Sequence, residues 1–499
     1  MAHLIQKLEF PEIVFGLVAP IGTPLDDTIS EITTFFSHMG YQVHNIRVTD
    51  LFKPLKKVIV PKKPLKNEPL KVRYESHIAY GNQVRKAAND ASVLAALTIK
   101  TIVETRIRKS SPEVEKFTRN VYILHQFKRP EEIDLLRSVY GAIFFQISVY
   151  SKRSSRVEYL ARRFSEEAGQ ANPSSFRSFA EALVEIDENQ SLEKFGQRVA
   201  KIFHDADLII NKDVHDPSIE SQLQRFMELL FSSNTITPTK QEYGMFAAKS
   251  AALRTADLSR QVGAAIFSEK GEIISMGSNE VPKSGGGTYW PDEEFDDREF
   301  KRKVDSNDKR KQELINEILK ELNVEWSKLS KKTQEKLKDS SFMDALEYGR
   351  IVHAEMSAIS DAARLRGALQ DSILFATTFP CHMCAKHIVS SGIAKVVYLE
   401  PYPKSLAFRL HSDSINVDGQ DRGDYSTYPA VEFIHFYGIT PRRYREFFER
   451  SKRKDGAGRL QFYRDDKKAP FIDIKSPFYA QLEDTVLESL RIASMDQEG

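Results

Sequence analysis

Cysteine is scarce in this chain: its 499 residues include only two, Cys381 and Cys384. The metal site inferred below needs both thiols, which leaves none for a disulfide bridge. The chain also has no apolar run near the roughly 20 residues that span a bilayer, and its first twenty residues lack a signal-peptide pattern. We therefore expect a cytoplasmic protein in a reducing compartment, without membrane contact.

An excess of charge of one sign is also missing. Lys and Arg total 72 against 70 Asp and Glu, a formal net charge of +2. This balance gives no electrostatic case for a nucleic-acid coat or a membrane-surface protein, and we expect no binding to double-stranded DNA. The length is sufficient for two or more domains, each with its own core.

A third absence concerns a turn near the N-terminus. A strand over 12–18, a glycine-bearing turn and a helix from about residue 28 form the context of a phosphate loop. The turn resembles the GxxxxGK[ST] loop of small nucleotide kinases, but its defining positions hold Ala19 and Pro24 for the glycines, Leu25 for the lysine and Asp26 for the hydroxyl. Because phosphoryl transfer relies on that lysine and on magnesium, we predict no kinase activity.

The rest of the N-terminal half still alternates strands with helices. Apolar runs predict further strands at 41–48, 121–124, 142–149 and 206–211. This order favours a parallel sheet with helices on both faces, as in the P-loop kinases that the turn resembles. A small polar stretch at 232–240 indicates a linker. We therefore predict a P-loop-kinase-like domain over residues 1–233.

The chemistry of the chain is concentrated between residues 353 and 384. His353 and Glu355 form a His-x-Glu pair, and Cys381 and Cys384 form a Cys-x-x-Cys pair directly after Pro380. One imidazole and two thiolates leave the fourth position of a tetrahedral Zn²⁺ open, which is typical of a catalytic site. Glu355 is not needed as a ligand and is free to move protons. His-x-Glu followed by Pro-Cys-x-x-Cys is the signature of the zinc nucleobase deaminases.

Simpler interpretations exist for the same residues. Two cysteines can be reduced core residues, or a Cys-x-x-Cys can be a redox pair. A redox pair, however, requires neither the preceding proline nor the upstream His-x-Glu. A degenerate zinc site without catalysis is the third alternative. We favour a catalytic Zn²⁺ held by His353, Cys381 and Cys384, and no other cofactor.

Local structure supports this choice. We expect one helix to begin at His353 and another at Cys381, with buried strands at 372–378 and 395–400. A strand, a helix and a strand in this order form a right-handed parallel unit, which brings both helix starts to one rim. The positive helix ends there favour thiolate over thiol.

The predicted reaction is hydrolytic. Zinc lowers the pKa of water towards neutrality, which yields a nucleophile for carbon 4 of cytosine. Glu355 takes a proton from that water, protonates ring nitrogen 3 and delivers a proton to the leaving ammonia, as a general base and acid.

Residues 240–440 resemble the deoxycytidylate deaminase family, through the segment RQVGA from Arg260, through Asn279, and through the HAE and PCHMC motifs. The resemblance implies a cytidine-deaminase-like three-layer α/β/α domain over 234–445, with an insertion at about 283–349, and a C-terminal extension over 446–499. Asn279 resembles the asparagine with which these enzymes hold the sugar hydroxyl; the alternative is a cap on a strand turn.

A narrower resemblance involves HAEMSAI, EPYPKS from Glu400 and LHSDSI from Leu410. Together with the kinase-like half, these segments resemble the bacterial anti-phage dCTP deaminases. The resemblance implies conversion of dCTP and dCMP to dUTP and dUMP, which depletes dCTP during phage infection. It also implies a homo-oligomer such as a hexamer, inhibited in some members by a small RNA.

Arg260, Lys404 and His411 are candidates to hold the phosphates, and Tyr289 lies near the predicted pocket wall. For the first three, a surface or supporting role is the alternative. The insertion residues 305–339 predict a solvated helical arm without chemistry. Two other functions remain open: deamination of a base within RNA or single-stranded DNA, and nucleotide sensing without turnover.

Overall fold

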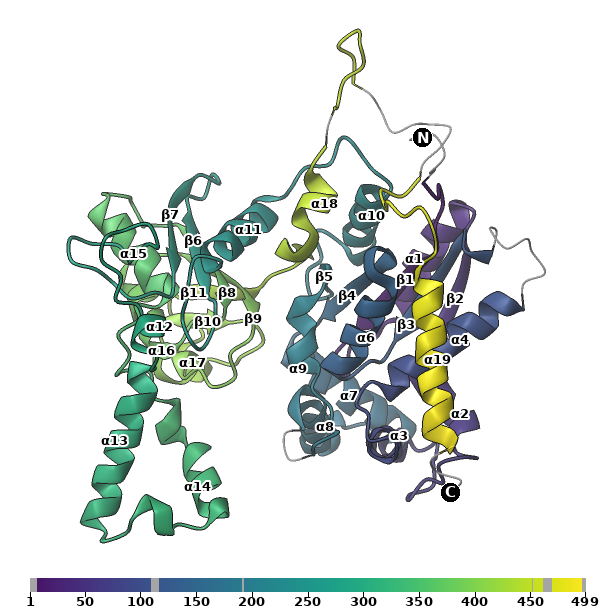
Figure 1. Ribbon diagram of the computed structural model, residues 1–499, viewed down its shortest axis with the longest axis horizontal. Coiled ribbons are helices and arrows are strands. Elements are labelled where there is room, and N and C mark those ends of the chain that lie inside the picture. The colour runs from purple at the N-terminus through teal and green to yellow at the C-terminus, as the bar shows by residue number, and fades with distance from the viewer. Residues whose placement is uncertain (1–6, 109–115, 191–192, 451, 461–468, 496–499) are drawn as a thin grey trace. The chain divides into compact units, whose positions relative to one another are not determined.

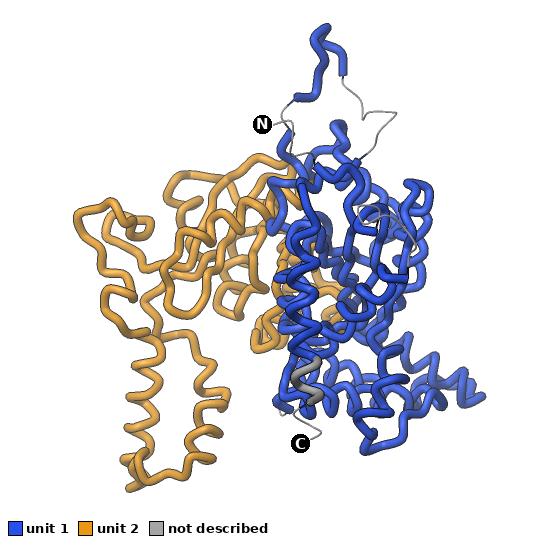
Figure 2. Tube along the Cα trace, turned by 45° about the vertical axis from the view of Figure 1, so that its right-hand side comes forward, with its two compact units in different colours: residues 1–238, 437–499 blue, residues 239–436 orange. Residues whose placement is uncertain are grey.

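The structure, a computed structural model, describes residues 7–108, 116–190, 193–450, 452–460 and 469–495. The chain forms two compact units, shown in Figure 2: unit 1 comprises residues 1–238 and 437–499, and unit 2 comprises residues 239–436. Residues 437–499, of which we predicted a separate extension from 446, thus belong to unit 1. None of the helices in the described part of the chain is long and apolar enough to cross a membrane.

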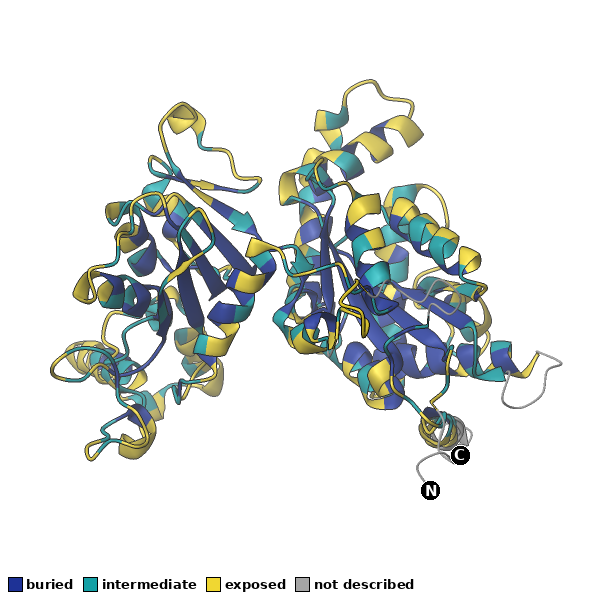
Figure 3. Ribbon diagram, turned by 90° about the horizontal axis from the view of Figure 1, so that it is seen from above, coloured by how far each residue is buried: buried dark blue, intermediate teal, exposed yellow. Residues whose placement is uncertain are grey.

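Unit 1 is built on a mainly parallel sheet with the strand order β12-β5-β4-β1-β3-β2 (Figure 1). Its strands are β1 (Ile13–Val18), β2 (Gln42–Arg47), β3 (Asn120–His125), β4 (Phe144–Tyr150), β5 (Leu208–Asn211) and the antiparallel β12 (Gly438–Ile439). The five parallel strands lie where the sequence predicted them. Every residue of β1, β3 and β5 is buried (Figure 3). Both faces of the sheet are therefore covered, as is usual for parallel sheets.

Helices supply that cover. They are α1 (Asp26–His38), α2 (Phe52–Leu55), α3 (Leu70–Ala87), α4 (Val93–Ile107), α6 (Pro130–Tyr140), α7 (Arg153–Glu167), α8 (Arg177–Asn189), α9 (Val199–Ile202), α10 (Ile219–Leu230), α18 (Tyr444–Phe448) and α19 (Tyr479–Met495). The alternation of strands and helices confirms the α/β class predicted for this half of the chain.

A buried charge cluster attaches α19 to the sheet of unit 1. Arg106 of α4 donates to Glu12 at 2.8 Å and to Glu483 of α19 at 2.7 Å. Tyr479 donates to Glu12 at 3.0 Å and Tyr140 to Glu483 at 2.9 Å. All five side chains are buried. Since removing one partner of a buried ion pair leaves an uncompensated charge, this cluster fixes the C-terminal helix in place.

Unit 2 contains a mixed sheet with the strand order β10-β11-β9-β8-β6-β7. Its strands are β6 (Gly263–Phe267), β7 (Ile273–Ser278), β8 (Ile373–Thr378), β9 (Lys395–Glu400), β10 (Ile415–Val417) and β11 (Val431–His435). β6 pairs antiparallel with β7 and β8, while β8, β9, β11 and β10 are parallel. The helices α11 (Lys240–Ala252), α15 (Ala354–Arg364), α16 (His382–Ser390) and α17 (Ala407–His411) complete the mixed α/β fold predicted for this half.

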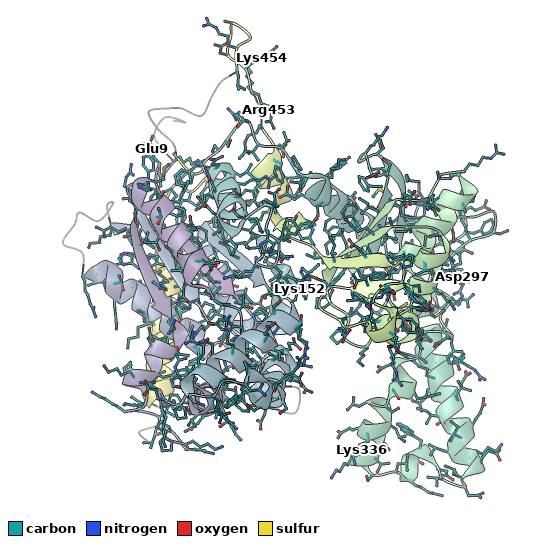
Figure 4. All side chains as sticks on the ribbon, turned by 180° about the vertical axis from the view of Figure 1, so that it is seen from behind. Glu9, Lys152, Asp297, Lys336, Arg453 and Lys454 are labelled. Atoms are coloured by element: carbon teal, nitrogen blue, oxygen red, sulfur yellow. The ribbon has the colours of Figure 1, made fainter. Side chains whose placement is uncertain are left out.

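The insertion between β7 and α15 belongs to unit 2, and its two ends lie side by side next to the sheet. The main chains of Glu280 and Val352 pair in an isolated bridge, with N···O distances of 3.3 and 3.1 Å. Beyond it lie α12 (Glu299–Arg302), α13 (Ser306–Glu321) and α14 (Lys331–Lys338). α13 and α14 form an arm of unit 2 (Figure 1), with Lys336 labelled on it in Figure 4. The bridge directly precedes His353, so the insertion begins and ends beside that residue.

Candidate metal centre and its cavity

The three predicted metal ligands meet at the starts of two helices. His353 is the N-cap of α15, Cys381 is the N-cap of α16, and Cys384 lies in the first turn of α16. The predicted helix starts are therefore confirmed. Helix N-termini carry partial positive charge, which favours the thiolate forms that bind metals.

The donor atoms fit a Zn²⁺ ion. His353 Nδ1 lies 3.3 Å from Cys381 Sγ and 3.4 Å from Cys384 Sγ, and the three donor atoms lie within 4.8 Å of one another. Zn–N and Zn–S bonds of about 2.0 and 2.3 Å place such atoms about 3.5 Å apart on a tetrahedron. The set supplies three ligands from two helix starts, so a fourth position stays open.

A close approach between α15 and the sheet holds His353 in position. A Cβ atom added to Gly277 of β7 would lie 2.2 Å from the carbonyl oxygen of Ala354 and 2.4 Å from the main-chain nitrogen of Ala358. Only glycine permits this packing distance. Gly277 therefore sets how deeply the first turn of α15, which carries Glu355, lies against the sheet.

Glu355 is buried beside the cysteines. Its exposed fraction is 4 %, and its Oε2 lies 3.4 Å from Cys384 Sγ. Burial, and next the nearby charge of Cys381, raise the pKa of the Glu355 carboxyl. A carboxyl whose pKa is shifted towards neutrality can both take up and release a proton in a reaction.

The two thiols differ in acidity. The hydrogen bond with Cys384 lowers the pKa of the Cys381 thiol to about 4. The same contact, together with burial, raises the pKa of Cys384 well above its ordinary value. Because the two thiols are in contact, the ionisation of one opposes the ionisation of the other when no metal is bound.

A cavity of about 360 Å³ opens onto the metal centre. The core of unit 2 contributes Asp257, Ser259, Arg260, Val262, Asn279, His353, Ala354, Glu355, Thr378, Phe379, Cys381 and Tyr402. The insertion and its return segment contribute Glu299, Asp305, Ser306, Asn307, Leu346, Gly349, Arg350 and Ile351. Its size is in the range of small-ligand sites.

The arm of the insertion, which was predicted to have no chemistry, contributes its first residues to the cavity wall. Asp305, Ser306 and Asn307, at the start of α13, line the cavity that contains Glu355. The apolar stripe of the arm was predicted at Leu314, Ile318, Leu319 and Leu322. Of these, Leu319 is buried but Ile318 and Leu322 are 53% and 65% exposed, and the buried face runs through Ile315 instead. No spacing in the sequence indicated that the first turn of α13 faces the cavity, because this contact is made only in the folded unit.

Two of the predicted substrate contacts line the cavity. Asn279 is 5 % exposed. The Arg260 side chain is 52 % exposed, and its nearest acidic atom, Glu400 Oε1, is 3.6 Å away. A half-exposed guanidinium with so long a contact remains available to a phosphate.

Three other predicted contacts are not among the described residues that line this cavity. Lys404 forms an ion pair of 2.6 Å with Asp344, and its side chain is 62 % exposed. His411 is the last residue of α17. The main-chain nitrogen of Tyr289 donates to the carbonyl oxygen of Val281 at 3.3 Å. Substrate binding by Lys404, His411 and Tyr289 stays a prediction.

Comparison with known proteins finds a family model that matches the segment containing this centre. Residues 238–400 match the family model described as the cytidine and deoxycytidylate deaminase zinc-binding region. A probable deoxycytidylate deaminase of Drosophila melanogaster is 28% identical over 181 residues, 36% of this chain and 68% of the fly protein. The deoxycytidylate deaminase of Enterobacteria phage T4 is 44% identical over 54 residues, 11% of this chain and 28% of the phage enzyme.

A solved structure is also similar. The dCMP deaminase of cyanophage S-TIM5, in complex with dCMP and dUMP, is 19% identical with a TM-score of 0.23, over 40% of this chain and 98% of that chain. The fly match covers 36% of this chain and the phage T4 match 11%, and the phage T4 match spans 28% of the phage enzyme's length.

Proposed function

We propose that this chain, whose residues 238–400 match the cytidine and deoxycytidylate deaminase zinc-binding region, removes the amino group of deoxycytidine nucleotides by hydrolysis. The observation that carries the proposal is the cluster of His353, Cys381 and Cys384 beside the buried Glu355, at a cavity that His353, Glu355 and Cys381 line. The products are deoxyuridine nucleotides and ammonia.

Glu355 moves the protons of this reaction. When bound, a Zn²⁺ ion lowers the pKa of water and so supplies the nucleophile at neutral pH. Glu355 accepts the proton that this water loses and delivers it to ring nitrogen 3 of cytosine. It then takes the remaining proton of the hydroxyl added to carbon 4 and passes it to the amino group, which leaves as ammonia while the oxygen stays on carbon 4 as a carbonyl.

We propose dCTP and dCMP as substrates, with depletion of dCTP as an anti-phage defence. The support in unit 2 is Arg260, whose half-exposed side chain lines the cavity and suits a substrate phosphate. The defence role, the homo-oligomer, the inhibitory RNA and the cytoplasmic location rest on the narrower resemblance of the sequence, and we retain them as proposals.

We further propose that unit 1 is a nucleotide-kinase-like scaffold that transfers no phosphoryl group. The loop after β1 leads into α1, and the first helical turn of α1 carries Asp26 and Asp27. Lys212 Nζ contacts both carboxylate oxygens of Asp27 at 2.7 Å and the carbonyl oxygen of Pro24 at 2.8 Å. Carboxylates occupy the helix end that phosphates need, and they repel anions.

Ammonia release tests the proposed function. Purified zinc-loaded protein is given dCTP, dCMP, CTP, dAMP or a cytosine-containing oligonucleotide. We expect turnover of dCTP and dCMP only, and a loss of several orders of magnitude in Glu355→Ala at unchanged zinc content. Glu321→Ala, an exposed glutamate of α13, is the matched control and keeps full activity. Turnover of the oligonucleotide alone would replace this proposal with editing of a polymer. Zinc-loaded protein that turns over none of them would instead favour nucleotide sensing.

A further inference from the structure

A buried carboxylate on the cavity wall has an unused acceptor atom. Glu299, the first residue of α12, is 2 % exposed and lines the same cavity as Glu355. Its Oε1 accepts a hydrogen bond from Ser306 Oγ at 2.7 Å. Its Oε2 is buried and, among the described residues, has no hydrogen-bond partner. Figure 4 labels the neighbouring Asp297 on this part of the insertion.

Arg350 lies near Glu299 but donates no hydrogen bond to Oε2. Arg350 Nη1 is 3.9 Å from Glu299 Oε1, outside hydrogen-bond range. Arg350 instead donates to Asp297, to its Oδ2 at 3.0 Å and to its main-chain oxygen at 3.2 Å. A buried acceptor without a donor is unfavourable, so a donor from a bound ligand stabilises the complex strongly.

The residue expected to hold the sugar is, by contrast, nearly saturated. Asn279 Nδ2 donates to Asp257 Oδ2 at 2.5 Å and to the carbonyl oxygen of Arg260 at 2.8 Å. Asn279 Oδ1 accepts from the main-chain nitrogen of Val262 at 2.8 Å. An amide has two donors and two acceptor sites, so Asn279 has no donor left and one lone pair. Asn279 therefore holds the wall together and keeps a single acceptor site for a ligand.

Glu299 lies on the same wall as Asn279. The main-chain nitrogen of Ser259 donates to Asp257, the partner of Asn279, at 3.0 Å. The side chain of Ser259 also contacts Asp305 Oδ2 at 3.5 Å. The next residue, Ser306, donates to Glu299. This chain of contacts joins the Asn279 wall to the insertion, and Cys381 and Glu355 line the metal centre of the same cavity.

The chemistry of a deoxycytidine nucleotide leaves one donor for Glu299. The only donor on the cytosine ring is the amino group, which reacts at Glu355. The phosphate carries acceptors and negative charge, and a carboxylate repels it. The remaining donor is the 3′-hydroxyl of the sugar. We infer that Glu299 Oε2 accepts a hydrogen bond from this hydroxyl, so the insertion recognises the 3′ position of the sugar; the inference rests on the proposed function.

The test compares dCMP with 2′,3′-dideoxycytidine monophosphate, which lacks the hydroxyl. A charge-assisted hydrogen bond at a buried site predicts a wild-type preference for dCMP of roughly ten- to a hundredfold in kcat/KM. In Glu299→Gln and Glu299→Leu the preference falls to about threefold or less, with the larger fall for leucine. Zinc content and melting temperature are measured for every variant. Asp308→Asn, an exposed acid of α13 that does not line the cavity, is the control and retains the wild-type preference.

The outcomes separate the inference from the proposed function. If wild-type protein deaminates both nucleotides equally, or if Glu299→Gln slows both in the same proportion, the inference is wrong and the deaminase function stands. If Asn279→Ala removes the preference while Glu299→Gln keeps it, Asn279 binds the hydroxyl and the inference is also wrong. If zinc-loaded wild-type protein deaminates no cytosine nucleotide, the proposed function fails and the inference fails with it.

Discussion

A methyl group at Gly277 should disable the metal centre from the opposite face of α15. In Gly277→Ala the new Cβ would lie 2.2 Å from the carbonyl oxygen of Ala354, closer than the 3.0 Å limit below which Cβ contacts essentially never occur. The obstacle is the main chain of α15, which cannot rotate away as a side chain can. The helix must therefore move as a body.

The size of that movement follows from the same distances. Relief of the contact requires α15 to retreat by at least 0.8 Å, from 2.2 to 3.0 Å. His353 and Glu355 lie at the start of this helix, whereas Cys381 and Cys384 lie on α16 and do not move with it. A misplacement of about 1 Å at a reacting centre costs on the order of a hundredfold in rate. Overpacking of this kind costs about 1–3 kcal/mol of stability.

Three measurements on Gly277→Ala check this reasoning: zinc content, thermal melting and ammonia release from dCMP. We expect a lower zinc content, a melting temperature lower by several degrees and a rate reduced by about a hundredfold. Gly81→Ala in α3 is the control, because a Cβ there meets nothing closer than 3.5 Å. It should leave activity unchanged. A Gly277→Ala protein with wild-type zinc content and rate would refute the argument that the close approach positions His353.

Four further predictions address the metal, the phosphate and the C-terminal helix. Cys384→Ser should lower zinc content and deamination together, as measured by elemental analysis and ammonia release, since the site loses one of its three ligands. Arg260→Gln should raise KM about tenfold for dCMP and leave KM for deoxycytidine unchanged; an equal effect on both would exclude a phosphate contact. Burial raises the pKa of the Glu483 carboxyl in the folded protein above its ordinary value of 4.5. Between 4.5 and the folded-state pKa, the unfolded chain loses this proton while the folded chain keeps it, so the free energy of unfolding falls as the pH rises. Glu483→Gln should therefore flatten the dependence of unit 1 stability on pH above 4.5, measured by urea unfolding, and an unchanged slope would contradict the buried position of Glu483. Arg106→Ala should destabilise unit 1 by about 3–5 kcal/mol, because Glu12 and Glu483 stay buried without a counter-charge.

The metal ligands were predictable because their signal is local. His353 and Glu355 are two residues apart, and Cys381 and Cys384 are three apart, so each pair lies within one helical turn whatever the rest of the chain does. The parallel strands of unit 1 were predictable for a related reason. Strands buried on both faces appear in the sequence as continuous apolar runs, such as residues 13–18.

The cavity wall was not predictable from the sequence alone. Glu299 is more than fifty residues before His353 along the chain, and the Glu280–Val352 bridge and the Ser259–Asp305 contact bring the insertion back to the metal centre. The C-terminal contacts are equally non-local. Ile439 pairs with Leu208 in a strand of two residues, too short for any periodicity to indicate. Glu483 reaches Arg106 through a buried ion pair, which no local pattern predicts.

The most direct test of the central claim is deamination of dCMP in water enriched in oxygen-18, followed by mass spectrometry of the product. Hydrolysis at carbon 4 with proton transfer by Glu355 predicts dUMP heavier by one oxygen-18 substitution, one equivalent of ammonia per dUMP, and no product from Glu355→Ala at wild-type zinc content. Product without the isotope, or undiminished product from the zinc-loaded Glu355→Ala protein, would contradict the account.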